Sequence, residues 1–219
     1  MKQASVLICI SVAASVCFSG VLQAAEAQPV SWADLAPAQV EYDNPFTELS
    51  MDQVDGLRRL LQLRSRNTGD DAKSSQEAAT LQAELEKSGL DVDLLFAKRE
   101  EIIQIRKAAA TGVNEAVLGR QVRLPGYVLP LEVKDYKSVE FLLVPTVGAC
   151  IHTPPPPANQ LIHVYYPQGI EVKGLYQPVW IQGQLARQQT VKTVRYVDGS
   201  AKIEVSYFME PIRVDPYRE

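Results

Sequence analysis

Residues 121–131 read QVRLPGYVLPL, and they open the half of the chain whose pattern indicates strands. Branched and aromatic residues are frequent in this stretch, as is typical of β-strands. Gly126 marks a bend, and a proline near each end of residues 124–131 fits an edge strand or the corner of a barrel. The same composition predicts further strands at residues 139–147, 161–166, 179–185 and 202–210.

Asp198 and Gly199 lie between two runs of branched residues, 194–197 and 202–205. An Asp-Gly pair in such a position is a hairpin signal, because both residues tolerate the positive φ that a tight turn requires. Short strands separated by glycine-marked turns predict a small antiparallel β-barrel over residues 119–219. The best single model is an OB-like barrel, which is a five-stranded, partly open Greek key.

Residues 32–118 show helical periodicity instead. Ser50 and Gln53 form a capping box, which predicts the start of a helix, and the polar run at 67–71 ends that helix. Further helices are predicted at 78–87 and from Asp91 or Asp93 onward. The expected fold class is therefore α+β, with a helical N-terminal region at residues 28–118 followed by the barrel domain.

Residues 1–27 have the features of a secretory signal peptide. Lys2 supplies a positive start, residues 4–18 form an uncharged apolar run, and Ala25-Glu26-Ala27 supplies the small residues of a cleavage site. We expect cleavage after Ala27, which places the mature protein in the periplasm. No later segment is apolar enough to span a bilayer, so we expect no membrane anchor after cleavage.

The formal net charge is −4, and the chain has no basic stretch. Proteins that bind nucleic acid or anionic lipid usually present clustered Lys and Arg. The composition therefore argues against both as partners. Hydrophobic residues make up 46% of the chain, which is enough for one sizeable core or two small ones.

The leader contains two of the three cysteines, Cys9 and Cys17. The third cysteine and both histidines follow within residues 150–163. Cys150 and His152 would point to the same face of an extended strand, and His163 could return opposite them after a loop. A thiolate with two imidazoles is a plausible zinc or copper site. Two alternatives remain open: a buried structural thiol, and a thiol nucleophile with His152 as its base.

Four prolines follow this pair: Pro154, Pro155, Pro156 and Pro157. Such a run favours a stiff polyproline II segment that exposes its carbonyl groups to solvent. It suits a recognition edge, and it equally suits a rigid connector between strands. Asn159 and Gln160 come next, and their amides could cap backbone groups or contribute to the same recognition rim.

Trp180 lies in the predicted strand at 179–185. It could line a ligand groove, although a tryptophan in such a strand more often belongs to the core. The chain contains no dinucleotide-binding glycine pattern, P-loop, serine-hydrolase elbow, zinc-protease helix or calcium loop. The candidate binding residues are therefore Trp180 and those of the proline segment.

Three stretches together resemble an uncharacterised family of exported proteobacterial proteins, domain of unknown function 3299. They are LPGYVLPL at 124–131, GACIHTPPPPANQ at 148–160 and PVWIQG at 178–183. The family offers no established catalytic residues. The resemblance implies a periplasmic accessory protein in metal handling, with zinc as the expected metal, that works beside a lipoprotein-export-like ABC transporter.

Three functional hypotheses follow. The first is a non-enzymatic binding protein of an envelope ABC-transport system that handles zinc or another metal, with Cys150 and His152 as ligands and His163 as a third. The second is a structural adaptor that docks the periplasmic domain of a transporter through its proline-rich edge without binding metal. The third is a thiol-dependent enzyme that uses Cys150 and His152.

Overall fold

The structure is a computed structural model, which describes residues 27–66, 72–148, 155–171, 174, 176–196 and 199–217. Its described part is a mixed α+β fold with three α-helices and a six-stranded sheet. The helices are α1 (Met51–Arg66), α2 (Ala72–Lys87) and α3 (Val92–Thr111). The strands are β1 (Gln28–Pro29), β2 (Gln121–Lys134), β3 (Lys137–Val144), β4 (Ile162–Glu171), β5 (Gln177–Tyr196) and β6 (Gly199–Pro216).

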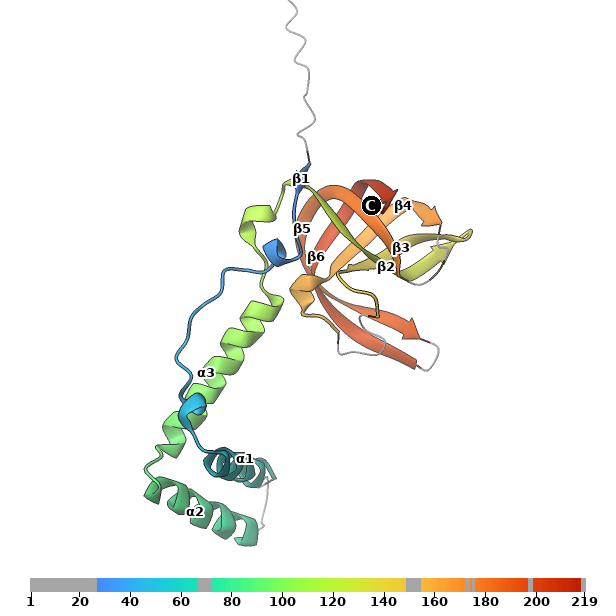
Figure 1. Cartoon of the computed structure of the whole chain (residues 1–219). Coiled ribbons are helices and arrows are strands. Elements are labelled where there is room, and N and C mark those ends of the chain that lie inside the picture. Colours follow the sequence, from blue (N-terminus) through green and yellow to red (C-terminus); the bar gives the residue numbers. More distant parts are fainter. Residues whose placement is uncertain are drawn as a thin grey trace, which may run out of the picture.

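The helices form a limb that projects from the strands, with α3 as the connection and α1 and α2 at the far end (Figure 1). The capping box is confirmed, since the Ser50 amide donates to Gln53 Oε1 at 3.0 Å and the Gln53 amide donates to Ser50 Oγ at 3.3 Å. Asp91 caps α3 by accepting a hydrogen bond from the Leu94 amide. The second helix starts at Ala72, earlier than predicted, because its first turns carry no apolar stripe that periodicity could detect.

The limb has a small core of its own. Leu57 and Leu60 of α1 pack against Leu85 of α2 and Leu95 of α3. Val54 and Leu61 lie at helical spacing from these two leucines of α1, but they are only half-buried. The apolar face of α1 is therefore wider than the surface that its helical neighbours cover.

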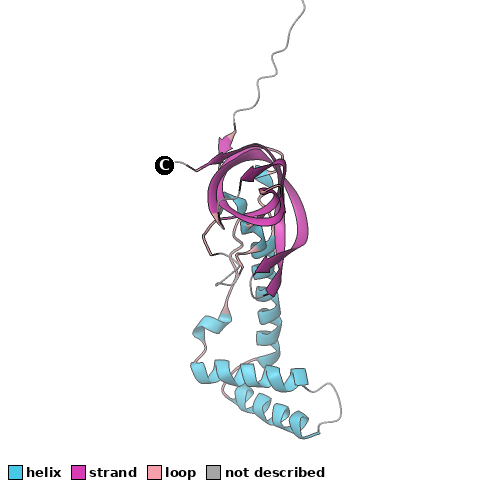
Figure 2. Ribbon diagram, turned by 90° about the vertical axis from the view of Figure 1, so that its right-hand side faces the viewer, coloured by secondary structure: helices cyan, strands magenta, loops and turns pink. Residues whose placement is uncertain are grey.

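The strand order is β1-β2-β3-β4-β6-β5, and β2 also pairs with β5. Each strand from β3 to β6 thus has two hydrogen-bonded neighbours and β2 has three, and the strands curve round a shared interior (Figure 2). Two pairings are parallel, β1 with β2 and β4 with β6, and the others are antiparallel.

The main core fills the interior between the strands. Side chains alternate along each strand, so that Phe141 and Leu143 of β3 point inward beside Ile162 and Val164 of β4. Leu35, from the short helical turn η1 (Ala33–Leu35), is fully buried in the same core. The segment that precedes the helices therefore also packs against the strands.

The strands β5 and β6 are longer than predicted. Their antiparallel pairing runs to Tyr196 opposite Gly199, which confirms the hairpin, although Asp198 lies outside the described residues. The prediction split β5 because the polar residues 187–190 interrupt the apolar pattern. The structure instead shifts register between Arg187 and Thr190 and continues the strand.

The ends of β5 and β6 nearest the hairpin turn form an arm. A second core cluster lies beneath this arm. It joins Val194, Ile203 and Val205 of the arm to Leu142 of β3 and to Leu161, which directly precedes β4. The outward-facing side chains of β3 are therefore covered as well as the inward-facing ones. This burial explains the continuous apolar run of residues 141–144.

The predicted signal peptide, residues 1–27, lies outside the described residues apart from Ala27. In the described part of the chain, no helix is both long enough and apolar enough to cross a membrane.

Candidate functional site

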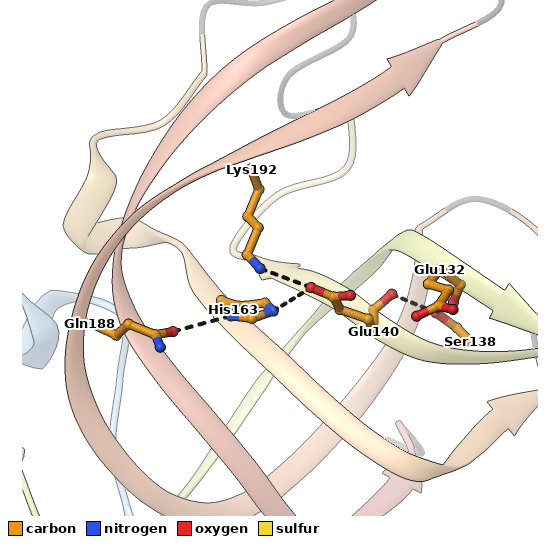
Figure 3. Close-up of polar contacts among 6 residues, drawn as sticks. All are labelled: Glu132, Ser138, Glu140, His163, Gln188 and Lys192. Carbon is orange, nitrogen blue, oxygen red and sulfur yellow. Dashed lines mark hydrogen bonds and ion pairs between the residues drawn. The ribbon is translucent and has the colours of Figure 1, made fainter.

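His163 lies on β4 beneath the arm and is 7% exposed. Its Nε2 atom is 2.7 Å from Glu140 Oε1, and its Nδ1 atom is 3.3 Å from Gln188 Oε1 (Figure 3). The ring also contacts Phe208, with 5.2 Å between the ring centroids. To bind a metal ion, His163 would have to give up one of its two polar contacts.

Glu140 is the centre of this polar cluster. Its Oε1 atom also accepts a hydrogen bond from Lys192 Nζ at 2.9 Å. Burial raises the pKa of the Glu140 carboxyl, but hydrogen bonds and charge interactions with Lys192 and His163 together lower the pKa by more. The carboxylate is therefore held in its ionised form between two basic side chains.

Strand alternation explains why these groups meet. Phe141 and Leu143 point into the main core, so Glu140 and Leu142 point to the opposite face of β3. On β4, His163 is the register partner of Leu142 and therefore shares that face. Lys192 and Gln188 reach the cluster from β5. A carboxylate within the apolar run of β3 was a signal for a polar partner, and sequence analysis missed it.

Cys150, His152 and Pro154 lie outside the described residues. Within the described residues, no group of three or more His, Cys, Asp or Glu side chains is placed to hold a metal ion. The structure thus brings His163 together with Glu140, and the assignment of Cys150 and His152 as metal ligands stays a prediction.

The remaining prolines lead into the short helical turn η4 (Ala158–Gln160). Pro155 and Pro157 are exposed, and Pro156 is half-buried. Asn159 is 1% exposed, and its Nδ2 donates to the carbonyl oxygens of Ala109 at 2.7 Å and Gly112 at 2.9 Å.

These two carbonyls belong to the C-terminal end of α3, where no further helical turn can satisfy them. Ser206 Oγ of β6 donates to a third carbonyl there, that of Thr111, at 2.7 Å. Gln160 Nε2 donates to the Trp32 carbonyl at 3.0 Å. Asn159 and Gln160 therefore cap backbone groups, and they fix the end of the proline segment to the end of α3 and to the start of η1.

Trp180 lies between the core residues Val179 and Ile181 but points to the opposite face of β5, where it is half-buried. The Arg123 guanidinium lies 4.4 Å from its ring centroid, and the Tyr217 ring stacks on it at 5.6 Å. An open cavity of about 410 Å³ lies here, lined by Arg123, Trp180, Arg213, Asp215 and Pro216. Of the two interpretations of Trp180, the structure favours a residue that lines a surface cavity.

Residues 32–216 match the model of a protein family of unknown function, DUF3299. The chain belongs to the DUF3299 family. A comparison with solved structures matches the chain to the crystal structure of a DUF3299 family protein from Pseudomonas aeruginosa PAO1, with 24% sequence identity and a TM-score of 0.47. The similarity covers 89% of this chain and 98% of that one. No curated protein matches the sequence.

This DUF3299 protein has one further candidate surface, which sequence analysis missed. The half-buried Val54 and Leu61 of α1 face Phe96 and Ile103 of α3 across an open cavity of about 490 Å³. Helical periodicity in the sequence does not reveal that part of the apolar face of α1 has no helix against it.

Proposed function

We propose that this DUF3299 protein is a non-enzymatic accessory protein of an envelope ABC-transport system in the periplasm. It docks a periplasmic domain of the transporter through the proline segment, of which Pro155 and Pro157 are exposed, and it handles zinc or another metal at Cys150 and His152. The observation that carries the proposal is the anchoring of the proline segment by Asn159 and Gln160. A stiff segment fixed in this way can bind a partner with little further loss of conformational entropy.

We further propose that strands β2 to β6 form the OB-like barrel expected from the sequence, with the helical limb as an N-terminal region. The pairings support this architecture, because β2 pairs with both β3 and β5 and so joins the two ends of the strand series. Counted from β2, the third strand is β4 and the fifth is β6. Their parallel pairing supports this architecture as well, because the third and fifth strands are neighbours in an OB-like barrel. Barrels of this kind serve as binding modules.

The metal function is tested with the mature protein, residues 28–219, purified from periplasm without a histidine tag. We expect near-stoichiometric zinc or copper binding that is lost in Cys150→Ser and in His152→Ala, because each change removes a ligand that the ion requires. Metal content and titration measure the effect. Gln104→Ala, at an exposed position of α3, is the control. Absence of binding at micromolar metal would remove metal handling from the proposal.

The docking function is tested with a photo-cross-linking amino acid at Pro155 or Pro157 in living cells. We expect cross-links from both positions to the periplasmic domain of the transporter, because both side chains are exposed on the anchored segment. Tyr136, which is 92% exposed at the turn between β2 and β3, is the control position and should give none. Equal cross-linking from all three positions would contradict docking through the proline segment.

A further inference from the structure

The open groove between α1 and α3 has an apolar floor. Leu61 of α1 and Phe96 and Ile103 of α3 contribute to it, and Ile103 is 36% exposed. The cavity of about 490 Å³ is large enough to accept several side chains of a ligand. Apolar surface that is left open in this way costs free energy in water, so the groove favours an occupant that removes it from solvent.

The sides of the groove are positively charged. Arg58, Arg99 and Arg106 line it, and no Asp or Glu does. Arg58 is paired with the exposed Asp55, and Arg106 donates to Tyr42 Oη at 2.9 Å. In the part of the chain that the structure describes, Arg99 has no polar partner. Two of the three guanidinium groups are therefore without a carboxylate in a chain whose net charge is negative.

We propose that this groove binds an amphipathic helix of a partner protein, whose apolar stripe is flanked by acidic residues. The proposal rests on the proposed docking function and names the chemistry of a second contact with the partner. The groove walls are helices and offer no strand edge, so a helix laid in the groove is the recognition mode that fits. A membrane surface fits less well, because a recessed apolar floor cannot reach into a bilayer as a protruding helix face does.

The charges predict the specificity. Glu or Asp beside the apolar stripe of the partner would meet Arg99 and Arg106, and opposite charges across an interface select the correct partner. Lys at the same positions would be repelled. The interaction should also weaken with added salt, since the guanidinium groups are at the rim and are screened there.

The test uses the mature protein and two synthetic helical peptides with the same leucine stripe, one flanked by Glu and the other by Lys. Fluorescence anisotropy should show that the Glu peptide binds at least about tenfold more tightly than the Lys peptide. The double variant Arg99→Glu, Arg106→Glu should reverse this preference. Ile103→Asp should abolish binding of both peptides, since it places a charge on the apolar floor.

The control is Arg195→Glu, which makes the same charge change at an exposed position of β5 and should leave the preference unchanged. Equal binding of the two peptides, or no binding of either at about 1 mM, would overturn the proposal. Tighter binding to phosphatidylglycerol vesicles than to the Glu peptide would also overturn it and would indicate a membrane site. The assay contains neither transporter nor metal, so its failure would leave the proposed function standing.

Discussion

Asn159→Ala should destabilise the protein by about 1–3 kcal/mol, because it removes a buried amide that donates to two carbonyl groups at the end of α3. Asn159 is 1% exposed, and its amide is the hydrogen-bond donor to the carbonyl groups of Ala109 and Gly112 at the end of α3. The free energy of unfolding from urea denaturation measures the loss. Amide hydrogen exchange at the end of α3 should accelerate at the same time.

Gln104→Ala is the matched control for Asn159→Ala. It removes an amide of the same chemistry from an exposed position of α3, where the Gln104 side chain donates only to the neighbouring Glu100. We expect it to change stability by less than about 0.5 kcal/mol. If the two variants were equally stable, the η4 turn would not anchor the helical limb, and the proline segment would lose its fixed position.

Glu140→Ala should lower stability at pH 7 by about 2–3 kcal/mol, because it removes the carboxylate partner shared by His163 and Lys192 beneath the arm. This value lies below the cost for a fully buried pair, since the Glu140 side chain is 25% exposed. Glu204→Ala removes an exposed carboxylate from β6 and is the control. Equal effects of the two changes would mean that the cluster does not stabilise the arm.

Glu140 also gives the wild-type protein a particular dependence on pH. The folded protein lowers the pKa of this carboxyl below its usual value of 4.5. Its contribution to stability is therefore complete above pH 4.5 and is lost as the pH falls through the lower, folded-state pKa. Urea denaturation should show the stabilities of wild type and Glu140→Ala converging on acidification. Parallel curves down to about pH 3 would contradict this assignment.

Local signals predicted the secondary structure where a side chain caps nearby backbone groups or favours a particular turn. The capping box of Ser50 and Gln53 located the start of α1, and Asp91, one of two predicted starts, caps α3. The Asp-Gly pair located the hairpin between β5 and β6. The length of these two strands was wrong, since the register shift near residues 187–190 preserves pairing where the hydrophobic pattern stops.

The candidate sites depended on contacts between distant residues, which no local pattern contains. The sequence predicted His163 as a metal ligand. Its partner Glu140 lies 23 residues away in the chain, and Lys192, which also contacts Glu140, is 52 residues from it. Asn159 was predicted to cap backbone groups or to form a recognition rim. Only the fold shows that it caps a helix that ends about 50 residues earlier.

The sequence by itself determined the family, the α+β class, the starts of α1 and α3 and the hairpin, because capping, periodicity and turn chemistry act between residues that are near in the chain. The tertiary structure alone decided that β2 pairs with both β3 and β5, that Trp180 faces outward and that the groove between α1 and α3 stays open. These features depend on which surfaces meet after the chain folds. An apolar stripe looks the same in sequence whether another element covers it or not.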